Sequence, residues 1–400
     1  MNNRISSANR FESTIAAMQQ RQSDLNQAQL QLSSGKRITR PSDDPTGAAR
    51  AERAYIAQQR LDSAQRSVAT SRSAMTLAEA ALGSANELLQ TSRDTLVAAG
   101  NGGFGVGERA ALVSQLKQLR SQLLSVANQT DGAGGYIFGG QGTTGEPFVD
   151  AIGGVAFVGT AGQTGLSAVE QVPTTVDGQA IWLSARTGNG VFQSAAAASN
   201  TGKSWIDAGG VSSPAALTGG SYDIVFSVSG GSTTYSVLKD GAPTAVAGAT
   251  YRSGTAIDID GQSVHVSGQP ADADTFSLTP STSTLDPFTL LSNAMTALGN
   301  PSANNGQVLQ AVSNGLRDLD AVMSQVQTAR SQAGAAMTRL DQMEQRNSDK
   351  SLWAKTVESN AEDVDMVQAV SDFQGKQTSY SAALQSYAMV HRMSLFDYLK

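Results

Sequence analysis

The chain has 400 residues, no cysteine and 16% charged residues, compared with roughly 25% in ordinary soluble proteins. Its length is enough for two or three domains, and the lack of cysteine excludes disulfides and thiolate metal sites. A basic front part, with 15 basic and 10 acidic residues in 1–130, precedes an acidic middle, with 4 and 13 in 131–300. So few charges suit a subunit that lies largely against other subunits.

Three classes of partner or route are excluded by the same totals. The basic residues are spread along the predicted helices without a cluster, so we expect no nucleic-acid partner. No stretch approaches the ~18 apolar residues of a membrane span, so we expect no membrane partner. The first 20 residues contain Arg4, Arg10 and Glu12 and no apolar run. They are therefore not expected to act as a cleaved secretory signal.

The first predicted helix, over residues 5–33, has an apolar seam with a period of seven. Such a period is typical of a narrow coiled-coil seam. Gln22 and Gln29 interrupt the seam, so this helix has a weak core and is expected to need partners. Gly35 is predicted to end it in the left-handed conformation. The seam residues, predicted to contact other subunits, are Phe11, Ile15, Met18, Leu25 and Leu32.

The second predicted helix begins at Asp44-Pro45, because Asp44 can cap it and Pro45 can occupy its first turn. It runs for about 55 residues, ~80 Å at the usual helical rise, to the glycine-rich stretch 100–107. Small residues alternate with the large ones along its seam, which lets a neighbouring helix approach closely. The large residues, predicted to form the seam inside each subunit, are Leu61, Val68, Met75, Leu82, Leu89 and Leu96.

The middle of the chain, residues 140–295, is rich in Gly, Ser, Thr and Val and alternates with a period of two. Alternation occurs at 222–228, at 257–259 and at 264–266, and it predicts antiparallel strands. The dipeptides Asp177-Gly178, Asn189-Gly190 and Asp240-Gly241 are candidate turns.

The last part of the chain is again predicted to be helical. Ser359 and Glu362 have the spacing of a capping box, which predicts the start of a final helix at Ser359. Glutamines recur on its seam, as they do near the N-terminus. The residues on or near this seam, also predicted to contact other subunits, are Val370, Phe373, Tyr380, Leu384, Tyr387 and Leu395.

The predicted fold is mainly α-helical, with a small antiparallel β-rich domain inserted in a long antiparallel rod built from both termini. The expected division has three parts. Residues 1–42 and 360–400 are the polymerisation helices, 43–139 and 296–359 are the rod, and 140–295 are the β-rich outer domain. The outermost helices are expected to order when many copies assemble, because new apolar burial then offsets the ordering entropy.

Several segments of the sequence resemble the flagellin family. The segment LSSGKRITRPSDDPTGAARA (32–51) is similar to the front segment of flagellin-like proteins, and its RPSDDP form is closer to the hook-associated members than to filament flagellin. GGYIFGGQGTTGEPF (134–148) and SGQPADADTFSLTPS (267–281) resemble segments of the hook-filament junction members. Their closing helix is similar to EDVDMVQAV (362–370), QTSYSAALQSYA (377–388) and SLFDYLK (394–400).

This resemblance implies a structural adaptor that polymerises as a ring or tube between the flagellar hook and filament. Its implied partners are other copies of itself, a neighbouring hook-associated protein, flagellin and an export chaperone. It implies an extracellular location in the bacterial flagellum, reached through the flagellar type III route. A flagellin-type filament subunit remains an alternative, as does an adhesin or binding module on a helical stalk.

The sequence predicts no enzyme, no cofactor and no metal site. Asp43 and Asp44 are more consistent with helix capping than with a metal or acid-base pair, since neither His265 nor His391 lies in a ligand spacing. The stretch 100–107 follows a helix and not a strand, so it does not fit a dinucleotide-binding loop.

Overall fold

The computed structural model describes residues 7–143, 145–166 and 172–397 and comprises two compact units. The terminal unit consists of Met1–Arg66 and Met343–Lys400, and the central unit consists of Ser67–Gln342. Both unit boundaries fall inside long helices, α2 (Pro45–Ala99) and α6 (Asn305–Glu362).

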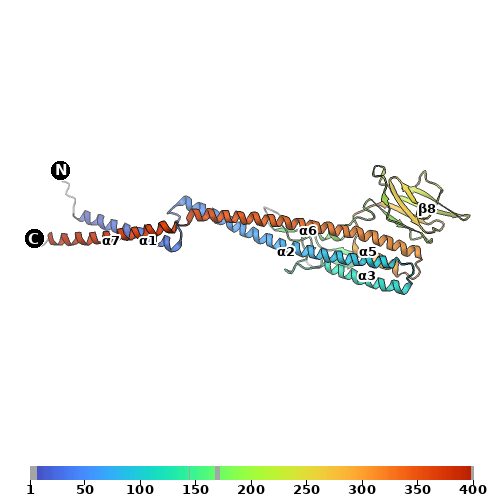
Figure 1. Cartoon of the computed structure of the whole chain (residues 1–400), viewed down its shortest axis with the longest axis horizontal. Helices are drawn as coiled ribbons and strands as arrows, with labels where there is room; N and C mark the ends of the chain where they lie inside the picture. The colour runs from blue at the N-terminus through green and yellow to red at the C-terminus, as the bar shows by residue number, and fades with distance from the viewer. Residues whose placement is uncertain (1–6, 144, 167–171, 398–400) are drawn as a thin grey trace. The chain divides into compact units, whose positions relative to one another are not determined.

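In the terminal unit, α1 (Ser7–Ser34) and α7 (Met366–Asp397) lie side by side (Figure 1). Arg21 Nη1 donates a hydrogen bond to the carbonyl oxygen of Ser379 at 3.1 Å. Nearer the end of α1, Lys36 forms an ion pair with Glu362. Residue numbers rise along one segment as they fall along the other, so the two ends of the chain pair antiparallel.

Two predicted helix boundaries in this unit are confirmed. Gly35 has φ of 69° and its amide donates to the carbonyl oxygen of Gln31 at 2.9 Å, which ends α1. Asp44 Oδ1 accepts from the amide of Gly47 at 2.9 Å, and Pro45 is the first residue of α2. Asp44 is thus a capping residue, as expected.

The predicted start of the last helix at Ser359 is wrong. Helix α6 continues through Ser359, whose carbonyl oxygen accepts from the amide of Asp363 at 2.9 Å. The new helix α7 is capped instead by Asp365, whose Oδ1 accepts from the amides of Val367 and Gln368 at 3.0 and 3.2 Å. The chain breaks at 363–365 because it pairs there with the loop after α1: the amide of Val364 donates to the carbonyl oxygen of Gly35 at 3.0 Å.

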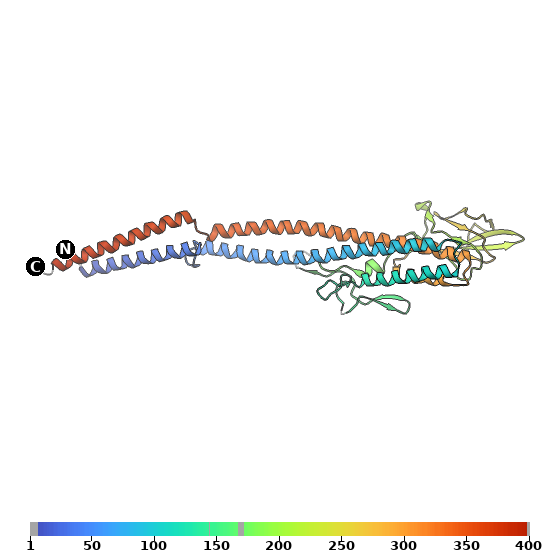
Figure 2. The ribbon, with the colours of Figure 1, turned by 60° about the horizontal axis from the view of Figure 1, so that its bottom comes forward.

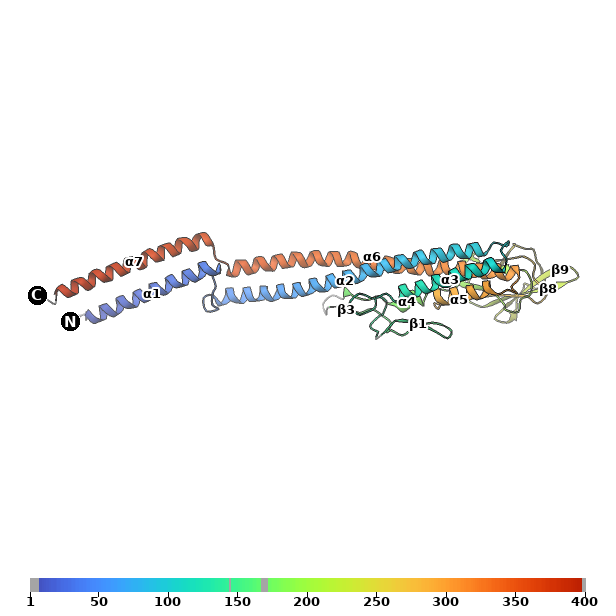
Figure 3. The same cartoon turned by 90° about the horizontal axis from the view of Figure 1, so that it is seen from below.

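In the central unit, α2 and α6 are also antiparallel. Arg330 pairs with Glu79 at 2.6 Å, and Arg93 pairs with Asp320 at 2.9 Å. Two shorter helices, α3 (Val106–Ala127) and α5 (Pro287–Gly299), pack against each other in this unit (Figure 3). Helix α5 was not predicted: it begins in the stretch 140–295 that was expected to be β-rich and extends four residues beyond it.

The larger group of strands forms two antiparallel sheets around one core. The six-stranded sheet has the order β10-β9-β8-β14-β5, with β11 paired to β9, and the four-stranded sheet has the order β12-β13-β6, with β7 paired to β13. The strands are β5 (Phe192–Ala196), β6 (Trp205–Ile206), β7 (Gly210–Val211), β8 (Tyr222–Ser229), β9 (Ser232–Lys239), β10 (Ala242–Pro243), β11 (Ala249–Thr250), β12 (Ala256–Ile259), β13 (Gln262–Ser267) and β14 (Thr275–Pro280).

The period-two stretches of the sequence correspond to β8, β12 and β13, and their inward residues, such as Ile224, Ile257 and Val264, are buried in this core. Asp240-Gly241 is the predicted hairpin turn between β9 and β10, with φ of 49° and 81°. Asp177-Gly178 is not a turn between strands. Asp177 caps the short helix α4 (Gly178–Trp182) by accepting from the amide of Ala180.

A second, smaller group of strands lies apart from the first within the central unit (Figure 2). It comprises the hairpins of β1 (Phe148–Ala151) with β2 (Gly154–Phe157) and of β3 (Gly165–Leu166) with β4 (Val172–Pro173). A cluster of aromatic rings joins this group to α4 and α5. The fully buried rings of this cluster are Phe138, Phe148, Trp182 and Phe288.

The larger β group is attached to α6 by two buried polar side chains. Gln310 Oε1 accepts from the amide of Ile206 at 2.8 Å, and Gln310 Nε2 donates to the carbonyl oxygen of the same residue at 3.2 Å. About two helical turns further along α6, Arg317 Nη1 donates a hydrogen bond to the carbonyl oxygen of Ser194 at 2.7 Å. These contacts fix β5 and β6 to the helix.

Candidate assembly surface

The long seam of α2 is almost completely buried inside the central unit. Its large residues there each have 3% or less of their surface exposed, and the small residues between them, such as Ala78 and Ala85, have none. Leu61, the first residue of the predicted seam, lies in the terminal unit and is only half-buried. The buried large residues are Val68, Met75, Leu82, Leu89 and Leu96.

The seam of the α1–α7 pair is much more open. Among the described side chains, Ala28 is the one buried residue of α1, and Ala369 is the one buried residue of α7. Val370 and Leu384 are exposed, at 43% and 41%. The half-buried residues of the predicted surface are Ile15, Met18, Leu25, Leu32, Phe373, Tyr380 and Tyr387. The side chains of Phe11 and Leu395 lie outside the described part.

Further large apolar side chains on these helices are exposed and were not part of the predicted surface. Leu30 of α1 is 51% exposed, and Met366, Val367 and Met389 of α7 are 49%, 84% and 61% exposed. Leu30, Val367 and Met389 were missed because they lie beside or opposite the period-seven seam that the prediction followed, whereas Met366 lies on it, seven residues before Phe373. A large apolar residue away from the seam of an otherwise polar helix was the available signal.

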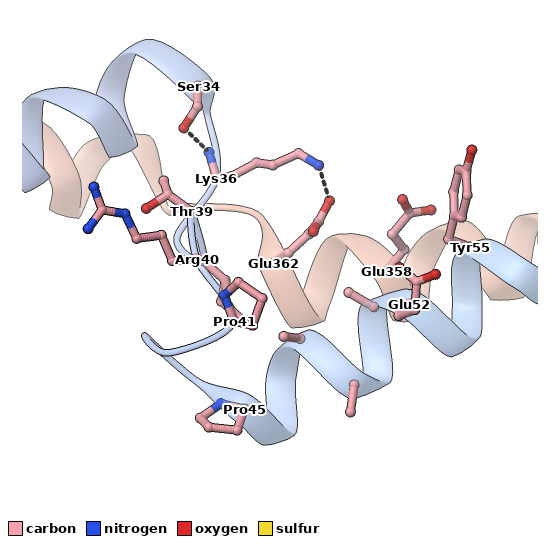
Figure 4. Close-up of a pocket in the computed structure, with 14 residues that line it drawn as sticks. Ser34, Lys36, Thr39, Arg40, Pro41, Pro45, Glu52, Tyr55, Glu358 and Glu362 are labelled. Atoms are coloured by element: carbon pink, nitrogen blue, oxygen red, sulfur yellow. Dashed lines mark hydrogen bonds and ion pairs between the residues drawn. The ribbon is translucent and has the colours of Figure 1, made fainter.

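The loop after α1 is held against the end of α6 by charges and backbone contacts (Figure 4). The Lys36 ammonium bonds the Glu362 carboxylate, and this contact raises the pKa of Lys36 above its usual value. Arg37 Nη2 donates to the carbonyl oxygen of Ala361 at 2.7 Å. Ile38 is buried, with 7% exposed. The loop is therefore part of the folded terminal unit.

The two acidic residues of this loop both act as acceptors. Asp43 Oδ2 accepts from the amides of Thr39 and Arg40 at 3.2 and 2.9 Å. These bonds, led by that from Arg40, lower the pKa of Asp43, and the bond from the Gly47 amide lowers the pKa of Asp44. Both carboxylates serve local backbone structure.

The groove drawn in Figure 4 runs between this loop, the first turns of α2 and the end of α6. Charged and polar side chains such as Arg40, Glu52 and Glu358 line it, together with Tyr55. Within the described residues, no three His, Cys, Asp or Glu side chains gather as metal ligands would. The described helices also include none that is long and apolar enough to cross a bilayer.

Family models identify both helical regions. The bacterial flagellin N-terminal helical region matches residues 5–143, and the bacterial flagellin C-terminal helical region matches residues 316–399. The two matches together cover more than half of the chain and include α1, α2, α7 and all of α6 from residue 316 onward.

Individual relatives extend the similarity to the rest of the chain. Flagellar hook-associated protein 3 of Salmonella typhimurium is 25% identical over 98% of this chain and 99% of its own length. Flagellin E of Vibrio cholerae is 34% identical, but over only 29% of this chain. A crystal structure of Xanthomonas campestris FlgL has 26% identity and a TM-score of 0.69, and the match covers 77% of this chain and 99% of that one. The chain therefore belongs to the flagellin family and, within it, is similar over nearly its whole length to flagellar hook-associated protein 3.

Proposed function

We propose that this protein is a structural subunit of the bacterial flagellum that assembles at the junction between hook and filament through its terminal helices. The observation that carries the proposal is the poor burial of the α1–α7 pair. It leaves Val370 and Leu384 exposed in a chain whose central seam is fully buried. Large apolar side chains left open on long paired helices favour contacts with further copies.

The proposed partners follow from this role. Other copies of the chain would cover the terminal helices, and a neighbouring hook-associated protein and flagellin would meet the two faces of the resulting ring. We also propose that an export chaperone binds the chain before assembly and that the chain leaves the cell by the flagellar type III route. Such a subunit acts through its contacts, so the proposal includes no catalytic step.

The test replaces Leu384 by Asp in the motile bacterium that carries this chain. Leu384→Asp places a charge on the open side of α7 and should abolish incorporation of the subunit into flagella, while leaving the central unit folded. Gln385→Asp adds the same charge to the neighbouring exposed polar position and is the matched control. The measurements are filament number by electron microscopy and the amount of the chain in sheared flagella. Normal incorporation of Leu384→Asp would contradict the proposal.

A filament subunit is the second candidate, because the match to Flagellin E over 117 residues is local but strong at 34% identity. The two functions differ in where the chain lies. Antibody labelling at one site next to the hook supports the junction, whereas labelling along the whole filament supports a flagellin. If the chain forms the junction, deleting its gene should leave hooks without filaments while flagellin is released into the medium.

A further inference from the structure

The terminal unit carries a second set of exposed apolar side chains, outside α1 and α7. Ile56 on α2 is 42% exposed, and Leu352 and Trp353 on α6 are each 68% exposed. Trp182 is completely buried, as is common for such a large apolar side chain, whereas most of the Trp353 side chain is in contact with solvent. Tryptophan is among the residues most enriched at the centres of protein interfaces.

The helical period places these side chains on the outer sides of the α2–α6 pair. Ala54 and Ala354 are buried, with 6% and 1% exposed, and mark the inner sides of the two helices. Ile56 lies about 200° around the helix from Ala54, and Trp353 and Leu352 lie about 100° and 200° from Ala354. Ile56 and Leu352 therefore lie on the outer sides of their helices and Trp353 on a flank of α6, and all three remain exposed within one chain.

Different charges accompany the two sites. Arg53 and Arg60, three residues before and four after Ile56, lie on one flank of it, and Glu52 lies on the other. Next to Leu352 and Trp353 on the outer side is Asp349. Lys350 and Lys355 lie on the two flanks of this second site.

The groove beside Leu352 lies between α2 and α6 of one copy. Leu61 and Gln65 of α2 and Ser348 of α6 line this groove together with Leu352. In the described part of the chain, the buried Oε1 of Gln65 has no hydrogen-bond donor. Because this atom is buried within one copy, a docked partner can contact the exposed Leu352 but not the Oε1 of Gln65.

We propose that the Ile56 side of α2 in one copy docks on the Leu352–Trp353 side of α6 in the next copy. Arg60 of the first copy then stacks on Trp353 and pairs with Asp349 of the second, a combination of cation–π contact and ion pair. Pairing two Ile56 sides would instead bring like-charged arginines together. The inference rests on the proposed function and adds a contact outside the terminal helices.

The geometry of this contact determines the kind of assembly. Two different surfaces of one subunit make a head-to-tail contact, and repeating such a contact closes a ring or continues as a helical tube. A second copy of this chain is thus the occupant, and each copy uses both of its sites.

Cross-linking in flagellated cells tests the proposal, and the cysteine-free chain makes every introduced thiol unique. Gln59→Cys and Thr356→Cys place thiols at exposed positions one turn from Ile56 and Trp353, leaving the apolar side chains intact. With a short bismaleimide, the double variant should give a ladder of covalent oligomers on a blot. Each single variant should give only monomer, because a head-to-tail contact never brings two identical positions together.

The outcomes separate this inference from the proposed function. Cells that swim and carry the double variant in their flagella, but give no ladder, overturn the docking contact and leave the junction role intact. Dimers from a single variant also overturn it, since they indicate a self-complementary contact. Absence of the natural chain from flagella counts against the proposed function instead, whatever the double variant does.

A charge exchange provides the second measurement. Arg60→Glu should lower the amount of the chain in sheared flagella by about tenfold, the factor that corresponds to one strong interface contact. Adding Asp349→Arg to the same chain should restore it, because the exchanged charges again attract. Arg339→Glu makes the same charge change at an exposed position of α6 in the central unit and should have no effect. Equal losses for Arg60→Glu and Arg339→Glu, or no rescue, contradict the contact.

Discussion

The α1–α7 pair and the central part of the α2–α6 pair are both antiparallel helix pairs with a period-seven seam, yet they bury their seams very differently. Leu89 of α2 has no exposed surface, whereas Leu25 of α1 is half-buried and Leu384 of α7 is 41% exposed. A completely buried leucine contributes about 1.5–3 kcal/mol more than an exposed one. The central pair therefore buries its apolar seam completely within one subunit, while the terminal pair retains apolar surface that other subunits can cover.

The largest loss of stability is expected for a substitution in the buried seam of α2. Leu89→Ala should lower the free energy of unfolding of the central unit by about 3–4 kcal/mol, because it removes a buried side chain and leaves a cavity. Chemical denaturation followed by circular dichroism measures it. A loss below about 1 kcal/mol would mean that the central seam is as loose as the terminal one.

The attachment of the β strands to α6 should have the next largest effect. Arg317→Met keeps the side-chain length but removes the donors to Ser194 and to Asp318, so it should cost about 2 kcal/mol. Arg186→Met, at an exposed arginine of the same unit, is the control and should change stability by less than about 0.5 kcal/mol. Similar values for the two variants would refute the anchoring role of Arg317.

The same substitution in the open seam should have a smaller effect on the isolated subunit. Leu25→Ala should cost less than about 1 kcal/mol in the monomer, because the side chain is only half-buried there. Incorporation into flagella should fall much more than monomer stability. A monomer loss equal to that of Leu89→Ala would erase the difference between the two helix pairs.

The smallest effect concerns pH. The pKa of Asp44 is lowered in the folded chain, mainly by the bond from the Gly47 amide, so its carboxylate stabilises the start of α2 above its unfolded pKa of about 3.9. This contribution should be lost as pH falls through the lower folded pKa. Amide exchange in the first turn of α2, corrected for intrinsic rates, should speed up in acid. Asp44→Asn should remove this pH dependence, and an unchanged dependence would contradict the assignment.

Most helix positions could be predicted because local signals and periodicity agreed. Gly35 and Asp44-Pro45 mark boundaries with their own backbone chemistry. Asp286-Pro287 carries the same start signal and caps α5 by accepting from the Thr289 amide, so this helix could have been found in the same way. The start of α7 could not, because both Ser359 and Asp365 are good caps and a contact distant in sequence, between Gly35 and Val364, decides between them.

The candidate surface was less predictable for a different reason. A period of seven identifies a seam but does not distinguish a seam that faces the same chain from one that faces another copy. Which half-buried residues of α1 and α7 contact a neighbour therefore stays a prediction. The outer side chains Ile56 and Trp353 follow no repeat at all, so only their exposure in the folded unit draws attention to them.

The pairing between the loop after α1 and the break before α7 has a mechanical consequence. Gly35 bonds Val364, and Arg37 bonds Glu362 and Ala361, so the two interruptions of helix lie at the same level and are fastened together. Within the terminal unit, α1 joins α2 and α6 joins α7 at one shared joint. Because the two interruptions are bonded to each other, a change of direction at this joint would move α1 and α7 together and keep the pair intact.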